Sequence, residues 1–174
     1  FEGSGGHPLA LEISEGSSGA SFTNIERFFE TEIASRLTPL EKSVLRFASV
    51  FRGPVPQDAL MHLKEAGVIG GVEGGGSQTM EAVQALLDRL LLNRSGSSYR
   101  THDILREHLN RTMDGSLRRA YHRTAAGYYE SLHHDRAGLE SIYHLVGAGD
   151  PSAIGEALAR YGESVVLRGF SEDL

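Results

Sequence analysis

The sequence contains no cysteine among its 174 residues. Disulfide bonds and thiolate metal sites are therefore excluded, and the composition fits the cytoplasmic location that we expect for this chain. No apolar run approaches the roughly 20 residues of a membrane-spanning helix, and no segment resembles a signal peptide. We therefore expect no membrane partner. With 40% apolar residues the chain can still build a core.

An excess of basic residues is also missing. Residues 1–38 carry two arginines against six glutamates, a net charge of −4. Residues 39–115 carry nine basic and nine acidic side chains, and residues 116–174 carry six against eight, a net charge of −2. Nucleic-acid-binding domains normally need a basic excess, so DNA is an unfavoured partner.

The common catalytic motifs are absent as well. The sequence has no GxxxxGK[ST], HExxH or GxSxG pattern and no cysteine nucleophile. Residues 67–76 include six glycines but lack the Lys-Ser/Thr pair of a phosphate loop, so they predict a mobile linker. The eight histidines form no metal set, and His133 and His134 are expected to point apart on a helix. We expect no catalytic residue, metal or cofactor in this chain by itself, and therefore no enzyme activity.

What the chain does contain is a regular sequence of elements around residues 86–109. Val83, Leu86, Leu87 and Leu90 lie on one face of a helix, which residues 79–90 are expected to form after a cap at Ser77 or Thr79. Residues 91–93 and 99–101 can pair as a β-hairpin across the polar turn between them. A further helix follows, with apolar residues every fourth position at Leu105, Leu109 and Met113. Helix, hairpin and helix form the closing half of a winged-helix domain.

The residues before this region supply the opening half. Thr38, Pro39 and Glu41 match a helix start with a capping box, and the following helix presents apolar residues up to Phe51. Residues 52–56 predict a short strand and residues 58–66 another helix. Upstream, residues 9–13 predict a short helix, and residues 21–37 a second one with an aromatic face.

After Gly115 the pattern is one of successive helices. An apolar stripe runs over residues 117–132 and continues over 139–146, and a new helix starts at Asp150 and Pro151. Tyr128-Tyr129-Glu130-Ser131 and Tyr161-Gly162-Glu163-Ser164 are 33 positions apart, near the period of tetratricopeptide-type helical hairpins. The predicted fold is mainly α: a helical linker (1–37), a winged-helix domain with a small β-hairpin (38–115) and the start of helical-hairpin repeats (116–174).

A winged helix raises the possibility of DNA binding. Its third helix would present Glu81, Gln84, Asp88 and Arg89, and its wing Arg94 and Arg100. Two carboxylates facing phosphates would repel them, so a protein-packing role is favoured. His102 and Asp103, at the exit of the second hairpin strand, have two interpretations. Asp103 can simply cap the next helix while His102 ends the strand, or the pair can mark an anion site at a helix N-terminus.

Two segments resemble motifs of the STAND class of signalling NTPases, which includes the NB-ARC ATPases. Gly-Gly-His-Pro-Leu-Ala-Leu at residues 5–11 resembles the GxP segment, and Tyr-Arg-Thr-His-Asp-Ile-Leu-Arg-Glu at 99–107 resembles the MHD segment, with Thr101 where Met is usual. The resemblance implies that residues 1–37 are the helical end of the nucleotide-binding module, followed by the winged helix (38–115) and the helical repeats (116–174) in the order of that class. The resemblance implies that Pro8 packs near the adenine, that His102 reaches the β-phosphate of ADP and that Asp103 supports the local fold.

The resemblance also implies what the chain lacks. The phosphate loop and the Mg²⁺-binding acidic strand are absent, so we expect this chain, which begins at Phe1, to be part of a longer NTPase that binds ADP or ATP with Mg²⁺. The expected partners are the upstream NTPase module, a protein ligand or effector of the helical repeats, and other copies in an oligomer of the parent. Two alternatives stay open: a winged-helix transcriptional regulator with a helical dimerisation region, and an adaptor without a nucleotide.

Overall fold

The computed structural model describes residue 27 and residues 29–65 and 76–167. The chain divides into two units, Phe1–Thr38 and Pro39–Leu174. In the first unit a π-helix, η1 (Phe29–Ile33), leads directly into a 3-10 turn, η2 (Ala34–Arg36). The helix predicted for residues 21–37 is present over residues 29–36, as a π-helix followed by a 3-10 turn rather than as a regular α-helix, while residues 1–26 lie outside the described residues.

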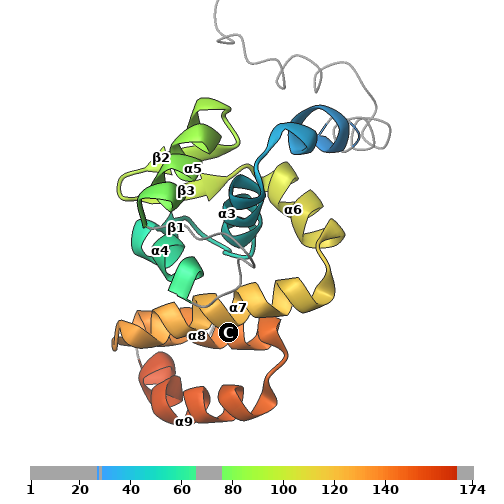
Figure 1. The fold of residues 1–174 in the computed structure, drawn as a ribbon. Helices are drawn as coiled ribbons and strands as arrows, with labels where there is room; N and C mark the ends of the chain where they lie inside the picture. Colours follow the sequence, from blue (N-terminus) through green and yellow to red (C-terminus); the bar gives the residue numbers. More distant parts are fainter. Residues whose placement is uncertain (1–26, 28, 66–75, 168–174) are drawn as a thin grey trace, which may run out of the picture. The chain divides into compact units, whose positions relative to one another are not determined.

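The second unit begins with the elements of the winged helix. They are α3 (Pro39–Ser49), β1 (Val55–Pro56), α4 (Gln57–Glu65), α5 (Gly76–Asp88), β2 (Leu92–Ser95), β3 (Ser98–Thr101) and α6 (Asp103–Thr112). Pro39 is the first residue of α3, as predicted, because its fixed φ suits a helix start. The buried side of α3, which includes Val44, Leu45 and Phe47, packs between α5 and α6 in the centre of this region (Figure 1).

The three strands form one antiparallel sheet in the order β1-β3-β2. Ser95 pairs with Ser98, so the hairpin turn contains only Gly96 and Ser97 and is tighter than predicted. Gly96 has a φ of 61°, a conformation that glycine adopts without strain. Val55 pairs with Tyr99, and both side chains are buried. The expectation of a mainly helical fold with a small hairpin is confirmed.

Three longer helices complete the unit: α7 (Gly115–Ser131), α8 (Asp135–Ala148) and α9 (Pro151–Leu167). They lie together beside the winged helix (Figure 1), with α7 against α4 and α8 between α7 and α9. Asp114 caps α7 through the backbone N–H groups of Ser116 and Leu117. The predicted cap of α9 is confirmed, because the Asp150 carboxylate accepts from the N–H of Ala153 at 3.2 Å.

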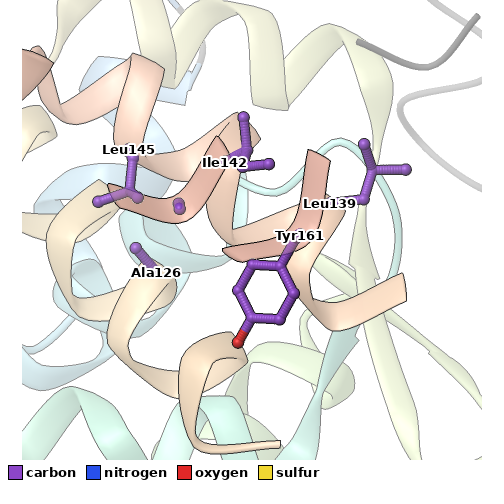
Figure 2. Packing of buried hydrophobic residues seen from close by; sticks show 6 residues of the cluster. Ala126, Leu139, Ile142, Leu145 and Tyr161 are labelled. Carbon is purple, nitrogen blue, oxygen red and sulfur yellow. The ribbon is translucent and has the colours of Figure 1, made fainter. Parts of the chain in front are cut away.

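The core of these helices is an apolar cluster. It consists of Ala126, Leu139, Ile142, Leu145, Ala157 and Tyr161 (Figure 2). Tyr161 lies so close to α8 that a Cβ at Gly138 would be 2.4 Å from the Cγ atom of its ring. Gly138 is therefore what allows α9 to approach α8 at this point.

Several local predictions are wrong. Helix α5 begins at Gly76, so Ser77 and Thr79 lie inside it and neither is its N-cap residue. His133 and His134 are not helical neighbours: they connect α7 to α8, His133 has a φ of 52°, and the Nδ1 atom of His134 caps α8 by accepting from the N–H of Ala137.

Two other predictions concern the helical region as a whole. Val146 belongs to the predicted apolar stripe but is 60% exposed. The winged helix and α7–α9 fall in one unit, and the boundary at residues 115 and 116 stays a prediction.

Candidate functional site

His102 lies on the surface, between β3 and α6. It is the N-cap residue of α6, but its side chain makes no capping hydrogen bond. Its Nε2 atom is 3.2 Å from the amide nitrogen of Asn93, which lies opposite Arg100 on β2. An amide nitrogen can only donate, so Nε2 accepts and the proton of the neutral ring lies on Nδ1. The structure thus leaves an exposed imidazole with an N–H donor at a helix start.

Asp103 is the first residue of α6 rather than its cap, so the interpretation of this side chain as an N-cap is wrong. Its Oδ1 atom instead forms ion pairs with Arg100 at 3.3 Å and with Arg106 at 3.5 Å. A carboxylate in the first turn of a helix is favourable because of the helix dipole. Together, these two guanidinium groups and one carboxylate carry a net charge of +1.

Pro8, the second residue expected to contact the nucleotide, lies outside the described residues. The part of the chain that the structure describes therefore contains one half of the predicted pair, namely His102 with its support Asp103. Thr101, the departure from the MHD pattern, is 2% exposed, and its buried hydroxyl oxygen has no hydrogen-bond partner.

The surface that a DNA-reading helix would use is polar but not basic. On α5 the exposed residues include Glu81, Gln84 and Asp88, and the amide of Gln84 donates to Asp88 at 2.8 Å. The guanidinium group of Arg89 is 2.6 Å from the buried carboxylate of Glu41 on α3. A helix whose exposed face carries carboxylates, and whose following arginine is paired within its own domain, is poorly suited to phosphates.

A second polar cluster lies inside the unit, and sequence reasoning missed it. His122 on α7 and His144 on α8 are 7% and 0% exposed, and their Nδ1 atoms are 3.1 Å apart. The ring of His122 lies against Gly147, where a Cβ would be 2.4 Å from its Nδ1 atom. The spacing of these histidines gave no signal, because they are 22 positions apart on two different helices.

Aromatic rings enclose His144. Its ring centroid is 4.7 Å from that of Phe51, 5.0 Å from that of Tyr143 and 5.6 Å from that of Tyr129, which stacks on it. Burial lowers the pKa of His122 to about 4 and that of His144 to about 3, and nearby arginines and the pairing of the two rings add to this effect. Both rings are therefore neutral near pH 7.

A pocket of about 620 Å³ opens beside this cluster, and Arg52, Tyr129, His134 and Glu140 are among its lining residues. The guanidinium group of Arg52 binds both carboxylate oxygens of Glu140, with its Nη2 atom 3.0 Å from Oε1. It also lies 5.1 Å from the centre of the Tyr143 ring. Since the charges of Arg52 and Glu140 compensate each other, the pocket offers no unbalanced charge from this pair to a ligand.

No group of three or more potential metal ligands occurs among the residues that the structure describes. Within the same residues, no helix has the length and apolar character to cross a membrane. A comparison of the chain with models of protein families, with curated proteins and with solved structures finds no significant match.

Proposed function

We propose that this chain is the regulatory part of a STAND-like signalling NTPase, in which the winged helix contacts a bound nucleotide through His102. The observation that carries the proposal is the exposed His102 ring, held by Asn93 so that its Nδ1–H can donate. Arg100 and Arg106 outnumber Asp103 beside it, and this local positive charge favours an anion. The proposal also draws on the resemblance of residues 5–11 and 99–107 to the GxP and MHD segments.

In this proposal the winged helix keeps the NTPase closed while ADP is bound. His102 donates to a phosphate oxygen of ADP, with Mg²⁺ and the phosphate loop supplied by the nucleotide-binding module of the same protein. A signal that reaches the helical region, or the exchange of ADP for ATP, separates the winged helix from the nucleotide. The helical region α7–α9 then serves as the part that contacts a protein ligand or effector.

The test is the substitution His102→Ala in the longer protein that contains the NTPase module. The loss of a hydrogen bond to a charged phosphate, about 1.5–3 kcal/mol, should weaken ADP binding roughly ten- to a hundredfold. Calorimetric titration with ADP measures this change. The matched control is His133→Ala, which removes another exposed histidine far along the chain and should leave ADP affinity unchanged. Equal ADP affinity of His102→Ala and wild type would refute the proposal.

A DNA-binding regulator is the alternative, and the order of elements from α3 to β3 is what favours it. The carboxylates of Glu81 and Asp88 on the exposed side of α5 oppose it. We expect duplex DNA to bind this chain no better than it binds unrelated acidic proteins, in a gel-shift assay near physiological salt. A sequence-preferring and salt-sensitive shift would favour the alternative.

A further inference from the structure

His144 lies where three parts of the second unit meet. It belongs to α8, pairs with His122 of α7 and contacts Phe51, the second residue after α3 of the winged helix. Its Nε2 atom is buried and has no hydrogen-bond partner. The structure thus places a titratable ring, with one satisfied and one unsatisfied nitrogen, at the joint between the winged helix and the helical hairpin α7–α8.

The distance between the two Nδ1 atoms determines how many of these two atoms carry a proton. At 3.1 Å one ring donates and the other accepts, so only one of the two Nδ1 atoms carries a proton. The assignment with His144 as donor leaves a lone pair at its buried Nε2, whereas the reverse assignment leaves an N–H there. Buried N–H groups without acceptors are the rarer of the two, so His144 is assigned as the donor and His122 as the acceptor.

A second proton has no good place in this arrangement. On Nδ1 of His122 it would put two N–H groups face to face at 3.1 Å. On Nε2 of His144 it would create a buried cation whose new N–H has no acceptor, since that atom has no partner. In either protonated form, the unfavourable interaction is removed only when the two rings separate and one of them reaches water.

We infer that the His122–His144 pair is a proton-operated latch, which holds α8 on α7 and on Phe51 while both rings are neutral and opens this joint when one further proton is taken up. The contact of α4 with α7, which includes the rings of His62 and Tyr128 at 5.7 Å, contains neither latch histidine. The opening therefore involves α8 and leaves the winged helix folded.

The groups around the latch offer no compensating negative charge. From α7 it faces Tyr129 and Arg118, and from the segment after α3 it faces Arg52. On α8 itself, the neighbours are the ring of Tyr143 and the carboxylate of Glu140, which is bound to Arg52. From α9, the ring of Tyr161 contacts α8 at Gly138. Gly138 is nine positions before Gly147, which contacts His122.

The sign of the pH effect follows from the low pKa values of both rings. In the folded chain these values are about 4 and about 3, below the ordinary value of 6.5 that each ring regains on opening. The open state therefore binds more protons between these limits. The latch is at full strength above pH 6.5, and its closing equilibrium weakens as the pH falls, by up to about tenfold per pH unit for each ring that takes up a proton.

Hydrogen exchange of the unmodified chain at pH 7.5 and pH 5.0, corrected for intrinsic rates, tests the inference. Amides of α8 should lose protection by at least about tenfold at the lower pH, because a separated helix of this length is marginal in water. Amides of β2 and β3 should change much less. Unchanged protection of α8, or an equal loss in α8 and in the hairpin, would overturn the inference.

A variant pair provides the matched comparison. The double variant His122→Leu/His144→Leu should show no acid-induced loss of protection specific to α8, whereas His133→Leu, on the exposed connection, should behave like wild type. If the double variant does not fold, nitrogen NMR of the wild type decides instead. It should show the Nδ1–H tautomer for His144 and the Nε2–H tautomer for His122, and both tautomers should persist down to about pH 5. Titration of both rings near pH 6.5, or an acid response retained in the double variant, would overturn the inference.

Discussion

His102 and His144 belong to the same unit, and both have a nitrogen partner, yet their surroundings are opposite. His102 is exposed, accepts from the amide of Asn93 and lies beside two arginines and an aspartate. His144 is fully buried, pairs with another histidine and is enclosed by Phe51, Tyr129 and Tyr143. The first can meet a ligand without any change in the fold, and the second cannot.

The difference separates two roles that a histidine count alone cannot distinguish. An exposed ring contributes little to the free energy of unfolding, so its loss should be visible mainly in binding. A buried ring contributes through packing and through its single N–H···N bond, so its loss should be visible mainly in stability. Substitutions at and around the two histidines can therefore test this difference in role.

The largest expected effect comes from His144→Ala. The substitution leaves a cavity between Phe51 and Tyr129 and removes the partner of the buried Nδ1 atom of His122. By comparison with aromatic side chains truncated in cores, the free energy of unfolding should fall by about 3–4 kcal/mol. Urea denaturation at pH 7.5 measures this change. A loss below about 1 kcal/mol would mean that His144 is not packed as described.

Gly147→Ala should act on the same pair without removing a ring. The added methyl group would overlap the ring of His122, and such overpacking costs about 1–3 kcal/mol. Gly127→Ala on α7 is the matched control, because a Cβ there has no atom within 4 Å. That change should instead stabilise the chain by about 0.5–1 kcal/mol through helix propensity. Equal effects of the two substitutions would contradict the close contact at Gly147.

The ion pair near His144 should have a larger coupling energy than the ion pair near His102. Arg52 and Glu140 are about one quarter exposed and make a two-pronged contact, whereas Arg100 and Asp103 are more than half exposed. A double-mutant cycle with Arg52→Met and Glu140→Gln should give a coupling energy of about 1 kcal/mol. The corresponding cycle with Arg100→Met and Asp103→Asn should give less than about 0.5 kcal/mol. Larger coupling in the exposed pair would reverse the comparison.

Local signals were sufficient for most of the helices and for the hairpin. Pro39 and Asp150 mark helix starts through chemistry that acts within one turn, and Gly96 supplies the positive φ of the turn. The break between α7 and α8 was missed because histidine is an unusual cap, and a periodic apolar stripe continues on both sides of it. Val146 was placed on the buried face because an apolar stripe shows which side of a helix is buried, but not how far around the helix the buried surface extends.

The candidate site was only partly within reach of the sequence. His102 could be selected because its neighbours along the chain form a recognisable motif, although the role of Asp103 as a cap was wrong. The buried pair could not be selected, since it depends on how α7 and α8 pack. Gly147 permits the close approach, but in the sequence it is simply one of 21 glycines.

The smallest expected effect is that of His102→Ala on this chain. The exposed ring makes one hydrogen bond with an exposed asparagine, and water can replace it on either side. The ion pairs of Asp103 and the start of α6 do not depend on it. The free energy of unfolding should therefore change by no more than about 0.5 kcal/mol, measured by urea denaturation beside His144→Ala. Binding of ADP or ATP by this chain alone should be too weak to measure before and after the substitution, because the chain lacks the groups that hold the phosphates and Mg²⁺. A clear loss of stability would make His102 a structural residue and remove the reason to assign it to a nucleotide. A stability loss confined to His144→Ala would instead leave His102 available for the contact proposed in the longer protein.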